Sequence, residues 1–571
     1  MVPQTHDSDI LILGAGGAGL FAALHAHKAA PELSITVAVK GLLGKCGCTR
    51  MVQGGYNVAL AKEDSVERHF MDTIEGGKWL PDQELAWKLV TLAVERVREL
   101  ENELGCFFDR NPDGTVHQKA FAGQSFDRTV HKGDLTGIEI MNRLAEQVWA
   151  RRIQRLEEHR AVELVRSADG ASIAGVLFID MRTGDYVFVR AKAVLLATGG
   201  GPTMYRYHTP SGDKSCDGLA MALRAGLRLR DMEMVQFHPT GLLAGPHTRM
   251  TGTVLEEGLR GAGGFLLGGN KERFMPAYDP KAERATRDIV SRAMFSEIRK
   301  GNTTPHGGLY ISMGHLGADR VRQEFKGMVE RCADCGFDLA AGLVEVVPTA
   351  HYMMGGVEFA ADCTTSIPGL FVAGEDSGGV HGANRLGGNG VANSTVFGAV
   401  AGDAMAAWVT KFGHLVEASG AELEAAIERC ERPLRAARGD LEALREKLHD
   451  TMWERVGIIR DEQGLTRALA ELDALDAELE STGIGSSARA FNLSWHDWLN
   501  LRSLVAVSRT IARTALARQD SRGAHYREDF PQTSALETSA YTSIGANGEV
   551  AMKPVAFTRV LPGQSLLKHA A

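Results

Sequence analysis

The sequence lacks any long run of apolar residues. No window of the 571 residues approaches 18 uninterrupted apolar side chains, and the first nine residues have neither the basic nor the apolar region of a signal peptide. We therefore expect a cytoplasmic protein without direct membrane insertion. Any association with a membrane would be made through partner subunits.

Cysteine is also scarce. Eight cysteines are too few for a disulfide scaffold in a chain of this length. Two close pairs occur, Cys46/Cys48 and Cys332/Cys335, but they lie about 290 residues apart and no His-x3–5-His run accompanies either pair. The sequence therefore predicts no metal site.

Charge of one sign is not in large excess, and proline is sparse. The 63 basic and 71 acidic residues give a net charge of −8, which provides no attraction to nucleic acid. Hydrophobic residues make up 44% and charged residues 23%, as in soluble folded proteins. The 17 prolines contrast with 65 glycines, a residue used where backbone approaches a ligand closely.

The first pattern with a chemical meaning lies near the N-terminus. An apolar run at 9–13 ends in Gly14-Ala15-Gly16-Gly17-Ala18-Gly19, a helical pattern follows, and a β-rich run returns at 33–39. The spacing G-x-G-x-x-G between a strand and a helix predicts a dinucleotide site, with a purely structural glycine turn as the alternative. Lys40 follows the second strand where NAD enzymes carry an acidic residue, which disfavours NAD.

Two further apolar strands also end in polar or glycine residues. The run at 193–197 is followed by Thr198-Gly199, and the run at 369–373 by Gly374-Glu375. Doubly wound sheets bind ligands at such carboxyl ends. The segment from about 240 to 345 has its own helices and strands and suggests an inserted domain. Helical spacing of Ala, Leu, Glu and Arg from about 415 to 520 predicts a helical domain.

Histidine and arginine recur in polar or glycine-rich stretches in and around the inserted segment. His238, Arg287, His351 and Arg385 each lie in such a stretch. Taken singly, each is more often a hydrogen-bonded structural residue. Two or three cationic groups that converge beside a flavin would instead bind an anionic substrate, because the planar fork of arginine matches a carboxylate.

These stretches belong to a longer ordered series. From about Asp9 to Pro531 the chain resembles the flavoprotein subunits of the succinate dehydrogenase/fumarate reductase family, which also includes L-aspartate oxidase. The motifs that carry the resemblance occur in the family's order: the N-terminal glycine turn, Gln53-Gly54-Gly55, Phe121-Ala122-Gly123-Gln124-Ser125, Gln236-Phe237-His238-Pro239-Thr240-Gly241, Arg287-Asp288-Ile289-Val290-Ser291-Arg292, Pro348-Thr349-Ala350-His351-Tyr352, His381-Gly382-Ala383-Asn384-Arg385 and Ser521-Arg522-Gly523-Ala524-His525-Tyr526-Arg527-Glu528-Asp529-Phe530-Pro531.

The resemblance implies an α/β fold with a Rossmann-like FAD-binding domain, an inserted α+β capping domain and a C-terminal helical domain. We expect the FAD-binding domain to be discontinuous, over 1–238 and 346–412. The capping domain, the helical domain and a C-terminal extension are expected over 239–345, 413–535 and 536–571.

The resemblance also implies that FAD, rather than NAD, occupies the glycine turn, with Glu375 binding its ribose. The implied cofactor-binding residues are Gly14, Gly16, Gly17, Gly19, Lys40, Cys48, Thr49, Gln53, Gly54, Gly55, Thr198, Gly199, Asp217, Glu375, Arg385 and Asn389. Cys48 stands where the respiratory members carry the histidine that bonds FAD covalently. A histidyl linkage is therefore impossible there, and we expect FAD to be bound non-covalently.

In the family's reaction, hydride passes between flavin N5 and one carbon of a dicarboxylate's C2–C3 unit, while an arginine handles the proton at the other carbon. Arg287 matches that arginine, and Glu257 and Asp288 are neighbours for a relay because a guanidinium alone is too basic to act as a free base. The implied catalytic residues are Arg287, His238, Glu257, His351 and Arg385. The implied substrate-binding residues are Phe121, Gln124, Glu256, His238, His351 and Arg385.

Three further positions depart from the family's pattern. Glu256 replaces a threonine that donates to a substrate carboxylate. An ionised glutamate would repel that carboxylate, so Glu256 is expected to be protonated, turned away or bound to another substrate group such as an amine. Ala262 replaces an acidic residue, and Gly390-Val391-Ala392-Asn393 replaces Ser-Leu-Leu-Asp/Glu after Asn389.

The sequence thus predicts an FAD-dependent oxidoreductase of the fumarate reductase/succinate dehydrogenase type that acts on a small dicarboxylate. An iron–sulfur subunit or other redox partner is expected, because the chain has no cysteine array for a cluster. The alternative is an oxidase or dehydrogenase of another carboxylate or of an amino dicarboxylate, as in aspartate oxidase. A non-enzymatic scaffold would be expected to lose His238, Arg287, His351 and Arg385, but the chain keeps all four. An NAD-dependent reductase would need a second nucleotide fingerprint, and the sequence has none.

Overall fold

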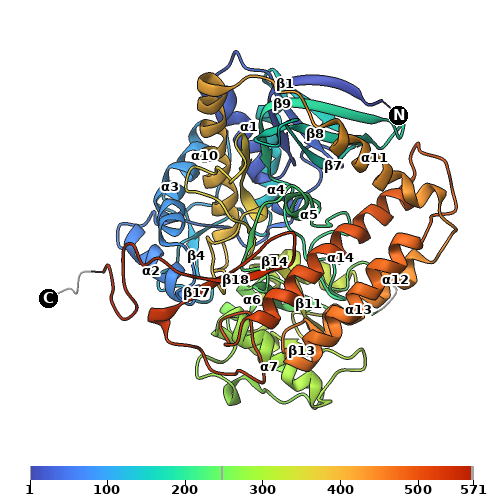
Figure 1. Cartoon of the computed structure of the whole chain (residues 1–571). Coiled ribbons are helices and arrows are strands. Elements are labelled where there is room, and N and C mark those ends of the chain that lie inside the picture. Colours follow the sequence, from blue (N-terminus) through green and yellow to red (C-terminus); the bar gives the residue numbers. More distant parts are fainter. Residues whose placement is uncertain (1, 246–247, 568–571) are drawn as a thin grey trace.

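The computed structural model describes residues 2–245 and 248–567, with a seven-stranded mixed sheet in its upper part in Figure 1. Strands β6, β2, β1, β9 and β16 run parallel, and β9 continues into an antiparallel arrangement with β8 and β7. Every residue of β2 is buried, as expected for a parallel strand covered on both faces. The strands are β1 (Gln4–Leu13), β2 (Ile35–Val39), β6 (Ile153–Glu157), β7 (His159–Arg166), β8 (Ile173–Asp180), β9 (Tyr186–Leu196) and β16 (Leu370–Val372).

Two helices lie against each other beside this sheet. Helix α1 (Gly17–Ala29) follows the glycine turn, and α10 (Asn389–Phe412) packs along it (Figure 1). Glycines in α10 permit the close approach, because a Cβ on Gly398 would lie 2.6 Å from the carbonyl oxygen of Ala18. The N-termini of both helices line the same cavity, described below.

Smaller elements complete this part of the chain. A three-stranded antiparallel sheet joins residues near 57, 119 and 130, and four helices connect or cover the strands. Their bounds are β3 (Tyr56–Asn57), β4 (Gln118–Lys119), β5 (Thr129–Val130), α2 (Val66–Gly76), α3 (Gln83–Asn102), α4 (Thr136–Trp149) and α5 (Asp217–Arg224).

The segment between the two long strands β11 and β14 forms a second compact region, green in Figure 1. Its sheet has the order β11-β14-β13-β12, and its own hydrophobic core is built from residues 242–346. The expected boundaries of the capping segment, at 238/239 and 345/346, fall inside β11 and β14. The elements are β11 (Val235–Leu242), β12 (Phe265–Leu267), β13 (Leu309–Ser312), β14 (Leu343–Met353), α6 (Gly258–Gly261), α7 (Arg287–Arg299), α8 (Ala318–Glu324) and α9 (Lys326–Ala333).

Four helices follow α10, as the spacing from 415 to 520 predicts. They are α11 (Gly420–Arg435), α12 (Leu441–Arg455), α13 (Glu462–Ser481) and α14 (Leu493–Ala517). Two buried tryptophans of α14 fix the packing, since Trp495 Nε1 donates to the Cys430 carbonyl (2.7 Å) and Trp498 Nε1 to the Leu479 carbonyl (3.1 Å). No helix among the described residues is both long and apolar enough to span a bilayer.

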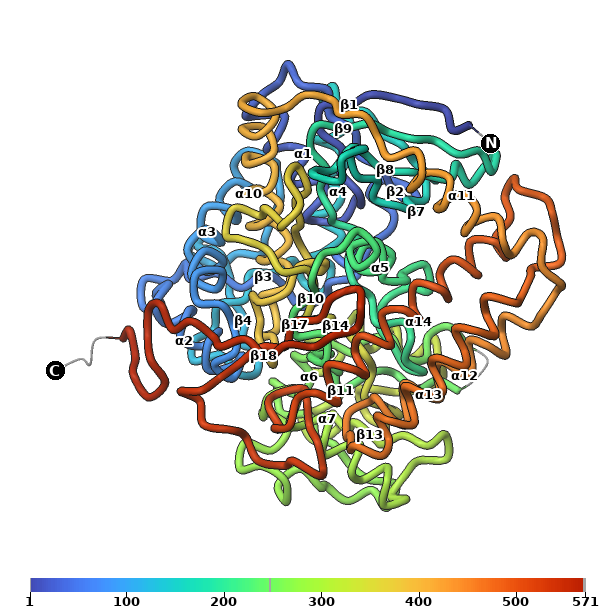
Figure 2. The backbone as a smooth tube through the Cα atoms, viewed as in Figure 1, coloured from blue at the N-terminus to red at the C-terminus, as the bar shows by residue number. Residues whose placement is uncertain are grey.

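The last strands return to the middle of the molecule, where Figure 2 shows the red segment crossing between the upper part and the green region. Strands β17 (Ala540–Ile544) and β18 (Val550–Pro554) form a four-stranded antiparallel sheet with β10 (Leu229–Arg230) and β15 (Gly356–Val357). The expected C-terminal extension is therefore part of a sheet with the preceding chain.

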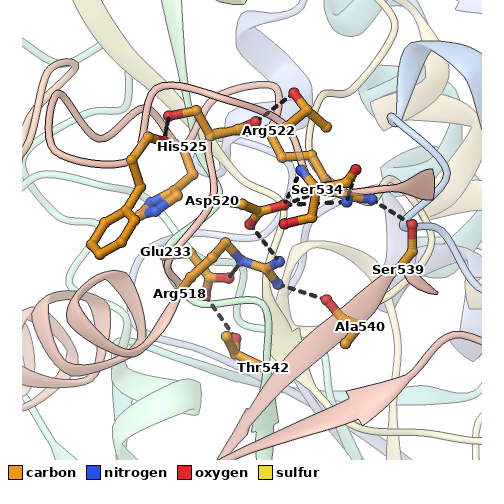
Figure 3. Close-up of polar contacts among 12 residues, drawn as sticks. Glu233, Arg518, Asp520, Arg522, His525, Ser534, Ser539, Ala540 and Thr542 are labelled. Atoms are coloured by element: carbon orange, nitrogen blue, oxygen red, sulfur yellow. Dashed lines mark hydrogen bonds and ion pairs between the residues drawn. The ribbon is translucent and has the colours of Figure 1, made fainter. Parts of the chain in front are cut away.

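A buried network of charged side chains holds this C-terminal segment in place (Figure 3). Arg518 Nε donates to Glu233 Oε1 (2.6 Å), and Thr542 Oγ1 donates to Glu233 Oε2 (2.7 Å). Asp520 Oδ2 accepts from Arg522 Nη2 at 3.2 Å. Each charge has a counter-charge, which a buried ion needs if it is not to destabilise the fold.

The turn that follows this network contacts two elements of the site described next. The carbonyl oxygen of Gly523 accepts a hydrogen bond from Arg292 Nη1 on α7 (2.7 Å). The amide of Ala524 donates to the carbonyl of Ala383 (2.8 Å), two residues before Arg385. The C-terminal motif thus supports both α7 and the loop that carries Arg385.

Candidate active site

One continuous cavity of about 580 Å³ runs between the parallel sheet and the green region. The glycine turn, Lys40 and Asp217 line it toward the sheet. His238, Arg287, His351 and Arg385 line it toward the region that begins at β11. The four cationic candidates of the sequence therefore lie along the same cavity as the dinucleotide motif, although they come from segments up to about 370 residues away.

The glycine turn is shaped by close backbone contacts. Gly14 has a φ of 108°, and a Cβ there would lie 2.1 Å from the carbonyl oxygen of Ala197. A Cβ on Gly19 would lie 1.9 Å from the carbonyl oxygen of Gly14. Gly16 and Gly17 line the cavity, and the amide of Gly17 donates to Thr49 Oγ1 (3.1 Å). The first and last motif glycines permit the turn, and the middle ones present backbone to the cavity.

The N-termini of α1 and α10 fit a negatively charged ligand. Neither helix has a capping side chain or an acidic residue in its first turn. The partial positive charges of two helix ends therefore face one cavity, which is the environment that a pyrophosphate or an electron-rich ring needs.

Polar side chains around the sheet end of the cavity are paired with one another. Lys40 Nζ donates to Asp217 Oδ2 (3.0 Å), and Arg160 Nη2 donates to Asp217 Oδ1 (2.7 Å). Burial opposes ionisation of Asp217, but Arg160 and Lys40 hold its pKa well below the usual range. Glu375 lines the cavity with its Oε1 accepting from the Met353 amide (3.0 Å), and burial raises the pKa of its carboxyl.

The segment from Cys48 to Gly55 forms another wall of the cavity. Cys48, Thr49, Gln53, Gly54 and Gly55 all line it. Burial raises the pKa of the Cys48 thiol to about 12, so this sulfur is protonated at neutral pH. A Cβ on Gly54 would lie 2.3 Å from the ring of Phe121, another lining residue, so only glycine fits beneath that ring.

Arg287 is held by a chain of buried charges. Its Nη2 donates to Glu257 Oε2 (2.6 Å), and its Nη1 donates to Gln236 Oε1 (3.1 Å). The other carboxylate oxygen of Glu257 accepts from Arg260 Nη2 (3.1 Å). Burial alone would raise the pKa of Glu257, but the charges of Arg287 and Arg260 outweigh it and the pKa falls below its ordinary value. Glu257 is therefore an anion between two guanidinium groups.

His238 and His351 are neutral at pH 7. The rings of His238 and His351 lie 5.4 Å apart, centroid to centroid. Burial, followed by the charge of Arg287, keeps the pKa of each histidine well below its ordinary value. His351 Nδ1 lies 2.8 Å from Thr209 Oγ1, and His238 Nδ1 accepts from the Thr240 amide at 3.3 Å. The accepted bond leaves the His238 proton on Nε2.

Arg385 supplies the second guanidinium of the site. It stacks over the Tyr352 ring, 4.3 Å from the centroid, and its buried Nε has no hydrogen-bond partner among the described residues. Burial, followed by the nearby charge of Arg287, lowers the pKa of Arg385 to about 10. The group remains a cation at neutral pH, with donors available to an anionic ligand.

Glu256 lines the cavity but takes no part in the hydrogen bonds that link Glu257 to Arg287 and Arg260. Its Oε2 lies 3.4 Å from Lys119 Nζ, at the end of β4. The repulsion expected from the sequence at this position is therefore opposed by a lysine, and no sequence motif indicates that pairing. Lys119 also lies over the ring of Phe121, 5.9 Å from its centroid.

Three residues expected in the site do not line the cavity. Gly19 packs against Gly14, as described above. Gln124 Nε2 donates to Asn57 Oδ1 (2.9 Å), and Asn57 Nδ2 donates to Asn389 Oδ1 (2.9 Å). Gln124 and Asn389 thus lie behind the wall, where they hold Asn57 and through it the carbonyl of Gly387. All other expected site residues line the cavity.

Sequence reasoning did not assign a role to three residues near the substrate end. Gln236 and Arg260 hold Arg287 and Glu257, as described above. Arg331 of α9 lines the cavity and donates to the Val254 carbonyl (2.9 Å). With its amide oxygen turned toward the guanidinium, Gln53 accepts from Arg331 Nη2 at 3.0 Å. Gln236 lies within one of the motifs that carry the family resemblance, whereas Arg260 and Arg331 do not.

Comparisons with known proteins agree with this geometry. A profile of the FAD binding domain family matches residues 9–391, and a profile of the fumarate reductase flavoprotein C-terminal region matches residues 445–566. The chain belongs to the fumarate reductase/succinate dehydrogenase flavoprotein family. The cofactor of this flavoprotein is FAD, and the α/β fold with its FAD-binding and C-terminal helical parts is confirmed.

Relatives cover nearly the whole chain. One subunit of the fumarate reductase (CoM/CoB) of Methanothermobacter marburgensis is 38% identical over 542 residues, which cover 93% of this chain and 96% of the relative. The fumarate reductase flavoprotein subunit of Escherichia coli is 35% identical over 546 residues, with 92% and 89% covered.

Solved structures agree with the sequence relatives. The flavoprotein of Escherichia coli quinol fumarate reductase, at 33% identity, superposes with a TM-score of 0.91 over 98% of this chain and 99% of its own. The Mycobacterium smegmatis Sdh1 structure, at 34% identity, gives a TM-score of 0.87 over 98% and 96%. The relatives' names describe subunits of larger redox complexes, so this flavoprotein is expected to work with a redox partner.

Proposed function

We propose that this flavoprotein interconverts a saturated and an unsaturated dicarboxylate of the fumarate/succinate type. The observation that carries the proposal is the placement of two guanidinium groups and two neutral histidines, Arg287, Arg385, His238 and His351, along the cavity that continues to the FAD motif. Two cations match the two carboxylates of such a substrate, and neutral imidazoles donate hydrogen bonds without adding charge.

The cofactor end of the cavity suits FAD. The glycine turn and the α1 N-terminus would hold the pyrophosphate, and Glu375 would bind a ribose. When bound, FAD supplies hydride transfer to or from a substrate carbon. The N-terminus of α10 faces the same cavity and would stabilise negative charge on the ring system.

The substrate end binds and polarises the dicarboxylate. Arg385, with its unpartnered Nε and its stacked position over Tyr352, would hold one carboxylate. His238 and His351 would donate to substrate oxygens and stabilise the negative charge that develops during transfer. His238 and Arg385 are buried, so their interactions with a substrate would be stronger than at a surface.

Arg287 would hold and move the proton. A free guanidinium is too basic to lose its proton to water, but Nη2 of Arg287 is bonded to the carboxylate of Glu257, which is bonded in turn to Arg260. A proton delivered from Arg287 to a substrate carbon can be replaced through the hydrogen bonds that join Arg287, Glu257 and Arg260. The relay predicted with Glu257 thus extends to Arg260, and Asp288 instead accepts from Thr286 Oγ1.

The direct test is a dicarboxylate panel. Purified holoprotein is assayed for reduction of fumarate and other unsaturated dicarboxylates with a reduced viologen, and for oxidation of succinate with an artificial acceptor. Turnover of fumarate or succinate above all other compounds supports the proposal. Turnover confined to compounds without two carboxylates would overturn it.

A second candidate reaction is oxidation of an amino dicarboxylate such as aspartate. The observation that favours it is the Glu256 carboxylate, which lines the cavity and could accept from a substrate amine. Aspartate therefore belongs in the same panel, with oxygen and fumarate as acceptors. Preference for aspartate over succinate would favour this reaction.

We infer that the redox partner is an iron–sulfur subunit. All eight cysteines of the chain are free thiols, and no group of three metal-binding side chains is assembled within 2–245 and 248–567. Electrons must then enter or leave through another carrier, and clusters held by a separate chain are suited to this. Copurification of a cluster-containing subunit from the native host is expected. A lone chain with full turnover on oxygen would contradict the inference.

A further inference from the structure

The Lys119–Glu256 pair joins two different parts of the molecule at the edge of the site. Glu256 precedes α6 in the green region, and Lys119 ends β4 of the three-stranded sheet, outside that region. Glu256 Oε2 lies 3.4 Å from Lys119 Nζ, and the pair has side-chain exposures of 8% and 22% for Glu256 and Lys119. The two residues are 137 positions apart in the sequence.

Adjacent glutamates in this segment have unequal counter-charges. Glu257 lies between two arginines that bind both of its oxygens. Among the described residues Glu256 has one cationic partner, Lys119, and a single long contact to it. Because Glu256 lines the cavity and Lys119 lies behind it, the carboxylate is the member of the pair that a bound ligand meets first.

An uncompensated carboxylate in this position would repel a dianionic ligand. A charge in a partly buried cavity acts on another charge with far less screening than at a surface. The Lys119 ammonium removes most of this repulsion because the pair as a whole is neutral. The Lys119 side chain is held near Glu256 by further contacts with the Gly133 carbonyl (3.4 Å) and the Phe121 ring.

We propose that the Lys119–Glu256 pair determines the affinity of the site for dianionic ligands: Glu256 weakens their binding and Lys119 compensates for it. The inference rests on the proposed function. Both residues act as specificity determinants through charge, and Lys119 has no contact with the reacting atoms. The pair selects among ligands by their net charge.

The test compares Lys119→Met, Glu256→Gln and the double variant. Binding of malonate, an unreactive dicarboxylate, is followed by the change in flavin absorbance of the holoprotein, and KM and kcat are measured on the best substrate. Lys119→Met should weaken malonate binding and raise KM by about tenfold, with kcat within about twofold. Glu256→Gln should tighten malonate binding. The double variant should bind malonate within about threefold of wild type.

Ligand charge provides an independent readout. The monomethyl ester of malonate carries one negative charge, so Lys119→Met should weaken its binding by about threefold, the square root of the effect on the dianion. A purely structural role for Lys119 would change both ligands equally. Equal effects on the dianion and the monoanion would therefore overturn the proposal.

Lys132→Met is the matched control. Lys132 lies in the same part of the chain, pairs with Asp109 (3.3 Å) and does not itself line the cavity. Its loss removes the same charge from the molecule and should leave malonate binding unchanged. Flavin content and apparent Tm identify any variant that has lost its fold.

Two results distinguish a failure of the proposal for the Lys119–Glu256 pair from a failure of the proposed function. Wild-type protein that binds malonate but converts no dicarboxylate would reject the function and leave the charge effect measurable by titration. Wild-type turnover of fumarate or succinate, with Lys119→Met and the double variant both at wild-type affinity, would reject the pair and leave the function standing. A fall in kcat without a change in KM in Lys119→Met would also reject it.

Discussion

Arg287 and Glu257 form a buried ion pair in which one carboxylate oxygen accepts two hydrogen bonds from the same guanidinium. Glu257 Oε2 accepts from Arg287 Nε at 3.1 Å and from Nη2 at 2.6 Å. The remaining Nη1 donates to Gln236. The guanidinium is therefore fixed on three sides before any substrate binds, which is the preorganisation that a proton-transferring group needs.

Arg287→Lys should lower turnover by at least about a hundredfold, as expected for loss of a positioned acid–base group. Lysine keeps the positive charge but cannot bond Glu257 and Gln236 together, because it lacks the planar fork. Flavin content and Tm should stay near wild type, and substrate binding should change little, as for an interaction made chiefly in the transition state. Steady-state kinetics and flavin titration measure these quantities.

The control for this prediction lies on the same helix. Arg299 is half-exposed at the end of α7 and pairs with Glu528. Arg299→Lys should have wild-type turnover, because an exposed pair contributes little. Wild-type turnover in Arg287→Lys would show that the assignment of Arg287 is wrong and would direct attention to His238 or Glu257.

Two glycines of the N-terminal turn should respond differently to alanine. In Gly19→Ala the new Cβ would lie 1.9 Å from the Gly14 carbonyl oxygen, which belongs to the backbone and cannot move away. We expect a chain with a lowered Tm and no FAD. In Gly16→Ala the nearest atom is Thr49 Oγ1 at 3.8 Å, so the chain should fold.

Gly16→Ala should nevertheless lose FAD affinity, because Gly16 lines the cavity and the methyl group occupies space there. The ratio of flavin to protein absorbance and the apparent Tm of both purified variants measure the two effects. A yellow Gly19→Ala protein with wild-type Tm would contradict the packing described for this turn.

FAD should be released when the protein is precipitated with acid or heat. Cys48 occupies the position of the linking histidine of the respiratory members, and burial raises the pKa of its thiol to about 12. The thiolate needed for nucleophilic attack on the flavin is therefore almost absent at neutral pH. Cys48→Ser should retain wild-type flavin content. A flavin-labelled peptide that survives denaturation and contains Cys48 would reveal a thioether linkage instead.

The features that could be predicted from the sequence are those encoded locally or in ordered motifs. The G-x-G-x-x-G turn predicts its own geometry because its last glycine, Gly19, packs against the carbonyl oxygen of its first, Gly14, within the same motif. The order of motifs predicted that His238, Arg287, His351 and Arg385 belong to one site, and all four line one cavity. These are short signals whose meaning does not depend on distant packing.

The features that could not be predicted depend on long-range contacts. Glu256 was identified as a departure, but its pairing with Lys119 joins residues 137 positions apart. Gln124 and Asn389 carry the right chemistry for a site, yet both are turned toward Asn57. Whether a polar residue faces a cavity or its supporting layer is decided by packing between segments, which a motif does not record.

The buried side chain of His69, which contacts Asn389 in this supporting layer, makes the stability of the protein depend on pH. Its ring is fully buried on α2, and its Nε2 bonds Asn389 Oδ1 at 2.9 Å. Burial, followed by the charge of Arg128, lowers the pKa of His69 to about 4. In the unfolded chain the pKa returns to about 6.5. Between these values the unfolded state binds more protons, so stability is complete above about pH 6.5 and is lost as the pH falls toward 4.

His69→Gln should therefore make the holoprotein less sensitive to acid. The amide of glutamine can still donate to Asn389 but does not titrate, so the variant lacks a destabilisation that reaches about 2 kcal/mol at pH 5 in the wild type. The apparent Tm of both proteins, measured by flavin fluorescence between pH 7.5 and 5, should fall less steeply in the variant, whatever their difference at pH 7.5. Parallel curves for the two proteins would show that His69 takes up its proton as easily in the folded protein as in the unfolded chain, and the burial argument for this histidine would then be wrong.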